Sequence, residues 1–203
     1  MIWLALGMSP ALAGTRDVPL SLVYQFQHEP PPAIFEAVQA ELDDIMFPVG
    51  LRFEWRPFAN NTGGELYNEL VIVKFQGACD LTDLRATTGY PGPFGWNHLI
   101  DGEVSRFIGI NCDGVRIFLQ WELLEIPAGR RVEVYGRAVA RVLAHEICHA
   151  LLGKKHGSTG IGKESYSVED LLSSRFLFNK RQAESLRAHG TDLLRRSEAV
   201  NGQ

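Results

Sequence analysis

The segment 137–152 places the strongest constraint on the fold, because it contains no Gly or Pro and is rich in Ala, Leu and Arg. These residues are strong helix formers, so the sequence predicts one long helix over about 132–152. Apolar residues recur along it at helical spacing and predict a buried face: Val139, Val142, Leu143, Ile147 and Leu151. Gly153 follows directly and predicts the end of the helix, since glycine readily takes the left-handed conformation found after helix C-termini.

The same segment carries His145-Glu146-Ile147-Cys148-His149, an H-E-x-x-H pattern. Residues four apart share a helix face, so His145 and His149 can direct ring nitrogens to a single zinc ion. Glu146 can reach a water molecule whose pKa the metal lowers, and can act as a general base during attack on a carbonyl. Alternatively, two histidines merely fall on a partly buried helix, but this explains neither the adjacent Glu nor the immediate helix end.

The third ligand of such a site is expected downstream of the helix, because a catalytic zinc ion generally takes three protein ligands and leaves one position for water. His156 is the first candidate. Once Gly153 has ended the helix, the chain is free to bring His156 back under the metal.

The stretch from His145 to His156 resembles the metzincin signature H-E-x-x-H-x-x-G-x-x-H, with one extra residue between the second His and the Gly. The resemblance implies a zinc metallopeptidase in which His145, His149 and His156 bind the metal. It also implies a single domain in the order strand, helix, mixed sheet, active-site helix and a chain reversal into a C-terminal part. Metzincins have a Met-turn beneath the metal, whereas this chain has no methionine after Met46. Either another residue such as Tyr166 takes that place, or the C-terminal half is built differently.

Glu169 is the rival third ligand. It lies on an expected helix beyond His149, which resembles the gluzincin arrangement of HExxH followed by a Glu on a later helix. However, the helix dipole favours acidic residues in a first turn for an unrelated reason, and Ser167-Val168-Glu169-Asp170 is typical of a capped helix start. Both His156 and Glu169 therefore remain open.

The pattern of elements predicts an α+β domain with a mixed, mostly N-terminal sheet, two long helices and a small helical C-terminal part. This order of elements resembles that of a metzincin. The expected strands are 19–26, 51–55, 70–75, 96–99 and 104–108, while 115–121 is a strand or a short helix. The expected helices are one that starts at Pro30-Pro31-Pro32 and runs to about Phe47, then about 132–152, one beginning near Ser167, and 180–188, followed by a flexible tail over about 190–203.

Asp101-Gly102 is a tight-turn signal and predicts a hairpin between 96–99 and 104–108. If this hairpin borders the metal site, it could pair its backbone with an extended substrate. The simpler interpretation is an ordinary exposed hairpin that carries one histidine, His98.

Residues 1–13 have the features of a signal peptide: a short apolar run over 2–8 and an A-x-A cleavage site at Ala11-Leu12-Ala13. The run is too short to span a bilayer. We therefore expect residues 14–203 to form one exported domain, secreted or periplasmic. The alternative is an apolar N-terminal strand.

The formal net charge of −4 gives no electrostatic reason to expect nucleic acid or an anionic membrane as a partner. The sequence has no second apolar run of membrane length. The expected partner is a peptide or protein substrate, and we expect a monomer that binds one Zn²⁺ ion.

The three cysteines are Cys79, Cys112 and Cys148. Cys79 and Cys112 lie at the ends of predicted strands and are expected to form a disulfide, which an exported protein can keep. Cys148 lies in the HExxH helix with its side chain expected to point away from the metal. The alternative is three small buried side chains without a bridge.

Two functions follow from these features. The first is a secreted zinc-dependent metallopeptidase in which Glu146 is the general base and later protonates the leaving amine. The second is a non-catalytic exported protein whose metal site is structural or binds a partner. A closed shell in which Glu169 joins the three histidines would favour the second, and a pocket beside Glu146 would favour the first.

Overall fold

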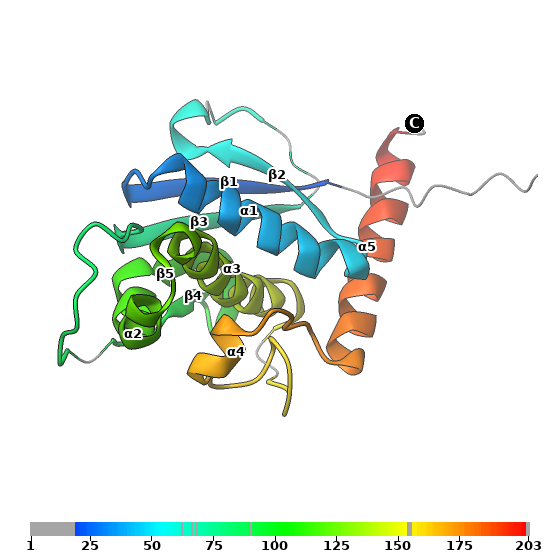
Figure 1. Ribbon diagram of the computed structural model, residues 1–203. Coiled ribbons are helices and arrows are strands. Elements are labelled where there is room, and N and C mark those ends of the chain that lie inside the picture. The colour runs from blue at the N-terminus through cyan, green and yellow to red at the C-terminus, as the bar shows by residue number, and fades with distance from the viewer. Residues whose placement is uncertain are drawn as a thin grey trace, which may run out of the picture.

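The computed structural model describes residues 19–61, 63–65, 67, 69–89, 91–153 and 156–201. The expected signal peptide, residues 1–13, lies outside these ranges. In chain order the elements are β1 (Pro19–His28), α1 (Pro32–Met46), η1 (Phe47–Val49), β2 (Arg52–Pro57), η2 (Phe58–Asn60), β3 (Leu70–Ala78), β4 (Gly95–Ile100), β5 (Glu103–Asn111), α2 (Cys112–Glu125), α3 (Ala128–Leu152), α4 (Val168–Leu172) and α5 (Lys180–Asn201). The expected α+β class and single domain are confirmed (Figure 1).

The five strands form one mixed sheet in the order β2-β1-β3-β5-β4. All neighbours pair in parallel except β4, which is antiparallel to β5 and forms an edge. Asp101 and Gly102 join these two strands with φ of 52° and 83°. Positive φ at both central residues is what a type I′ hairpin turn requires, so the predicted hairpin is confirmed.

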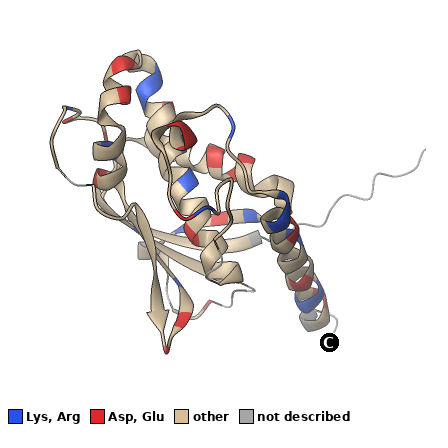
Figure 2. Ribbon diagram, turned by 90° about the horizontal axis from the view of Figure 1, so that it is seen from below, with Lys and Arg blue, Asp and Glu red and all other residues tan. Residues whose placement is uncertain are grey.

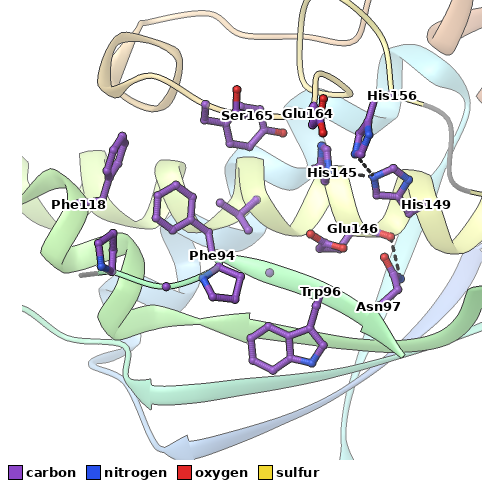
Figure 3. Close-up of a pocket in the computed structure, with 16 residues that line it drawn as sticks. Phe94, Trp96, Asn97, Phe118, His145, Glu146, His149, His156, Glu164 and Ser165 are labelled. Carbon is purple, nitrogen blue, oxygen red and sulfur yellow. Dashed lines mark hydrogen bonds between the residues drawn. The ribbon is translucent and has the colours of Figure 1, made fainter. Parts of the chain in front are cut away.

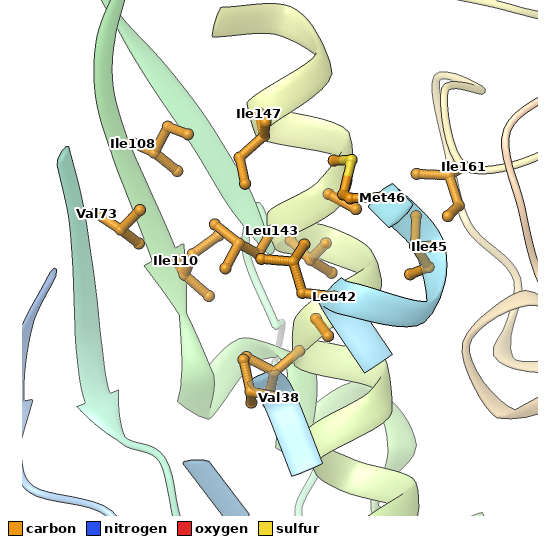
Figure 4. Close-up of a cluster of buried hydrophobic side chains, with 14 of the residues drawn as sticks. Val38, Leu42, Ile45, Met46, Val73, Ile108, Ile110, Leu143, Ile147 and Ile161 are labelled. Carbon is orange, nitrogen blue, oxygen red and sulfur yellow. The ribbon is translucent and has the colours of Figure 1, made fainter. Parts of the chain in front are cut away.

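The core lies between the sheet and the paired helices α1 and α3, which run side by side over one face (Figure 1). A Cβ on Gly136 of α3 would lie 2.5 Å from the Cβ of Ala37 on α1, so only glycine permits this close approach. Buried apolar side chains from α1, α3 and the sheet meet there: Val38, Leu42, Ile45, Leu143, Ile147, Val73, Ile108 and Ile110 (Figure 4).

Helix α3 contains the predicted helix and begins four residues earlier, directly after Pro127. It ends at Leu152 as expected, and Gly153 has a positive φ of 81°. Its ψ of −179° differs from the expected left-handed helical value, so the chain leaves the helix extended. The ambiguous segment 115–121 is helical and lies in α2, because the Asn111 side chain caps this helix by accepting from the Gly114 N–H.

The expected end of the last helix at 188 is wrong, because α5 continues to Asn201 and includes residues 190–201 of the expected tail. Leu186 and Leu193 are buried two turns apart on one face of α5. Gly190 between them lies against Leu51, where an added Cβ would meet Leu51 Cδ2 at 3.1 Å. Basic and acidic residues alternate along the helix (Figure 2), which gives it a polar exposed face. The apolar spacing of this helix was present in the sequence but obscured by its many charges.

The predicted disulfide between Cys79 and Cys112 is confirmed, with a Cα–Cα distance of 4.9 Å. Cys79 directly follows β3, and Cys112 directly follows β5. Because these strands are parallel neighbours, their carboxyl ends lie together and bring the two cysteines into reach. Cys148 is free and buried. None of the helices in the described ranges has both the length and the apolar character needed to cross a bilayer.

Candidate metal centre

Three histidine rings converge at the C-terminal end of α3 (Figure 3). The Nε2 atom of His149 lies 2.9 Å from Nε2 of His145 and 3.1 Å from Nε2 of His156. His145 and His149 come from consecutive turns of α3, and His156 comes from the segment after Gly153. The structure therefore brings together the three histidines that the sequence singled out.

The other ring nitrogens of the two helical histidines face backbone carbonyls. Nδ1 of His145 lies 2.8 Å from the oxygen of Ile161, and Nδ1 of His149 lies 3.3 Å from the oxygen of Gly153. A carbonyl only accepts, so each Nδ1 carries the proton and Nε2 is the acceptor atom of each neutral ring. The pKa of His145 is lowered to about 4, mainly by burial, so its ring is neutral at pH 7.

This arrangement fits a zinc ion. Two nitrogens bound to one tetrahedral zinc ion at 2.0–2.1 Å lie about 3.3 Å apart, close to the two measured separations. Lone pairs that point at one another repel unless a cation lies between them. Backbone carbonyls that hold the outer nitrogens are also the usual partners of zinc-binding histidines.

Glu146 lies beside the histidines with its side chain buried in a narrow space. Its exposed fraction is 6%, and this burial raises the pKa of its carboxyl group to about 7. A Cβ on Gly95 of β4 would lie 2.8 Å from Glu146 Cγ, so the strand contacts the carboxylate side chain directly. The side-chain amide of Asn97, also on β4, donates to the backbone oxygen of Glu146 at 3.2 Å.

The histidines and Glu146 open into a cleft of about 700 Å³. Trp96 and Asn97 of β4 lie on one wall, and Glu164 and Ser165 lie on the opposite wall (Figure 3). Gly95 and Tyr166 also line the cleft. Beyond Glu146 the cleft becomes apolar, where the rings of Phe94 and Phe118 lie 4.8 Å apart near Val142. The expected hairpin thus borders the site through residues 95–97, while His98 is exposed and does not line the cleft.

The other candidate ligands, Glu169 and Cys148, do not belong to the cluster of the three histidines. Within the described part of the chain, the potential ligand atoms that gather within 4.8 Å of one another belong to the three histidines, and Glu169 is not among them. Glu169 lies in the first turn of α4, whose predicted cap is confirmed as a capping box between Ser167 and Asp170. Burial raises the pKa of the Cys148 thiol to about 12, which keeps it neutral and a poor metal ligand.

Arg141 was not singled out from the sequence, yet it connects the site to the C-terminal part of the chain. It lies one turn before His145 on α3, and its side chain is fully buried. Its Nε donates to Glu41 at 2.8 Å, and its two terminal nitrogens donate to the backbone oxygens of Asp170 and Ser173, each at 2.8 Å. An Arg among apolar helix residues was the available signal, because a buried charge requires such partners.

No family model matches this chain, and no curated protein matches it in sequence. A solved structure with a similar shape is that of archaemetzincin from Methanopyrus kandleri. The two chains are 16% identical, the match covers 88% of this chain and 98% of that chain, and the TM-score is 0.48.

Proposed function

We propose that this protein is a zinc-dependent metallopeptidase that hydrolyses peptide bonds. The observation that carries the proposal is the convergence of the His145, His149 and His156 rings beside the Glu146 carboxylate, all four lining one open cleft. The resemblance of His145 to His156 to the metzincin signature supports the same assignment.

His145, His149 and His156 would hold the ion through Nε2. When bound, zinc supplies polarisation of the scissile carbonyl and lowers the pKa of a water molecule. Glu146 takes a proton from the attacking water molecule and delivers it to the leaving amine nitrogen. Its buried position suits this role, because a carboxyl group whose pKa lies near the working pH can both accept and release a proton.

The substrate is proposed to bind as an extended chain along β4. This strand is at the edge of the sheet and pairs with β5 on one side only, as far as the described strands show. Its residues 95–97 already line the cleft, so a peptide added beside them would pass Glu146 and the histidines. The apolar end between Phe94 and Phe118 favours a substrate with an apolar side chain.

Export through residues 1–13 and action as a monomer are further parts of the proposal. The Cys79–Cys112 disulfide supports export, since such bonds persist in oxidising compartments. The N-terminus of protein recovered from the periplasm of a bacterial host tests this directly. A mature chain that begins at Gly14 is expected, whereas protein retained in the cytosol with residues 1–13 intact would contradict export.

The test of the mechanism compares wild type with Glu146→Gln and Glu169→Gln, using zinc analysis and cleavage of a mixed peptide library. Wild type should bind about one zinc ion per chain, as a His₃ site predicts. Glu146→Gln should keep the metal and lose turnover, and Glu169→Gln should keep both. Full turnover in Glu146→Gln would overturn the mechanism. Bound zinc without cleavage of any peptide by wild type would favour the non-catalytic alternative.

A further inference from the structure

The backbone oxygen of Ile161 accepts two hydrogen bonds from side chains of the site. One comes from Nδ1 of His145 at 2.8 Å, and the other comes from the hydroxyl group of Tyr166. A carbonyl oxygen has two lone pairs, so these two donors use its full capacity. The orientation of the Ile161 carbonyl therefore depends on both His145, a candidate metal ligand, and Tyr166.

The peptide around Ile161 is held at several other points. Its N–H donates to the oxygen of Leu177 at 3.1 Å, and its side chain is fully buried. The preceding Gly160 has a φ of 71° and lies so close to Leu177 that an added Cβ would be 2.3 Å from that oxygen. These contacts anchor the peptide on one side, and Tyr166 anchors its carbonyl on the other.

The ring of Tyr166 also contacts His145 directly. The two rings pack edge to face, with centroids 5.5 Å apart and an angle of 77° between their planes. On its other side Tyr166 packs in the same manner against Phe176, at 5.7 Å and 81°. Tyr166 thus limits the rotation of the His145 ring by contact.

We infer that Tyr166 is a positioning residue that fixes the tautomer and ring orientation of His145 through Ile161, and thereby sets the affinity of the site for its metal. The inference rests on the metal-binding part of the proposed function and does not depend on peptidase activity. The proton on Nδ1 leaves Nε2 as the acceptor atom of the ring, toward His149 and His156. Tyr166 acts on this geometry without becoming a ligand itself.

The size of the effect follows from the behaviour of such outer partners in other metal sites, where their loss typically costs 10–100-fold in metal affinity. Tyr166→Phe keeps the ring that contacts His145 and Phe176 and removes only the hydroxyl group. We therefore expect the lower part of that range, about a 10-fold weaker zinc affinity.

Tyr135→Phe is a matched control. The Tyr135 hydroxyl group also donates to a backbone oxygen, that of Cys112 at 2.9 Å, and the residue is fully buried. It lies on α3 well before the histidines and does not line the cleft. The same chemical change is thus made inside the same helix, away from the metal centre.

The experiment measures the zinc dissociation constant of full-length wild type, Tyr166→Phe and Tyr135→Phe by competition with a chromophoric chelator. Thermal unfolding of each metal-free protein confirms that all are folded. Tyr166→Phe should bind zinc about 10-fold more weakly, with an altered visible spectrum after cobalt substitution, while Tyr135→Phe stays within about twofold of wild type.

Equal zinc affinity and equal cobalt spectra in wild type and Tyr166→Phe would overturn the inference and leave the proposed function intact. Equal weakening in both variants would show a general loss of stability and would also overturn it. Failure of wild type itself to bind zinc would overturn both the inference and the proposed function.

Discussion

Gly95 and Glu146 both line the cleft and lie in direct contact with one another. A Cβ built on Gly95 would lie 2.8 Å from Cγ and 2.9 Å from Oε1 of Glu146, and 3.0 Å from Val142 Cγ1. A Cβ atom does not tolerate a heavy atom closer than 3.0 Å, so any side chain at this position must displace the Glu146 carboxylate or the strand.

We therefore predict that Gly95→Ala lowers kcat/KM by about 100-fold, the usual effect of moving a catalytic group by 1 Å. Zinc content should stay at the wild-type level, because the histidines are not touched. Steady-state kinetics beside metal analysis provides the measurement. Gly129→Ala is the control, because an added Cβ there has no heavy atom within 4 Å. Wild-type kinetics in Gly95→Ala would contradict the contact.

Arg141→Met is predicted to lower the free energy of unfolding by about 3–5 kcal/mol, because removing one partner of a buried ion pair leaves the other charge buried without compensation. The Glu41 carboxylate would lose its partner, as would the backbone oxygens of Asp170 and Ser173. Chemical denaturation measures the change. Arg195→Met removes an exposed pair with Asp192 and should cost at most about 1 kcal/mol. Equal losses in the two variants would refute the structural role of Arg141.

Phe118→Ala is predicted to change substrate preference more than metal binding. The apolar end of the cleft loses a ring that contacts Phe94, so peptides with an apolar residue should lose about 10-fold in kcat/KM relative to polar ones. Competition between two labelled peptides in one reaction gives this ratio. Trp121→Ala, on the same helix but 61% exposed, should leave the ratio unchanged. An unchanged ratio in Phe118→Ala would place the selective contacts elsewhere.

Zinc should raise the thermal stability of the chelator-treated protein. A ligand at 1,000 times its dissociation constant adds about 4 kcal/mol to the folded state. Wild type and Glu146→Gln should both show this increase, and His149→Ala should not, since Nε2 of His149 lies between the other two ligand atoms. Differential scanning calorimetry with and without zinc reports the shift. A zinc-dependent increase that survives in His149→Ala would exclude the three-histidine site.

Features that depend on neighbouring residues could be predicted from the sequence. The hairpin at Asp101-Gly102, the end of α3 at Gly153 and the cap at Ser167 all follow from local backbone preferences. The proximity of His145 and His149 could also be predicted, because both lie on the same face of one helix.

Features that depend on contacts between residues distant in the sequence could not be predicted. Gly95 and Glu146 are far apart in sequence, and nothing around Gly95 indicates that a helix will contact it. Asn97 and Arg141 likewise acquire their roles only from the backbone atoms that fold onto them. Spacing alone also left open whether His156 or Glu169 would lie beside His145 and His149, and the three histidines gather only in the folded chain.

The three histidines are divided between α3 and the chain after Gly153, so metal binding would depend on the packing of that later segment against the helix. One helix carries His145 and His149, whereas His156 and the Ile161 carbonyl that contacts His145 belong to the segment 156–166, which packs back against the helix. Because Arg141 holds the following segment, the binding energy of the ion adds to the closure of the C-terminal part. Bound there, zinc would act as a cross-link between two sections of the chain, and a polypeptide that ended before His156 would lack one of the three histidines that converge at the site.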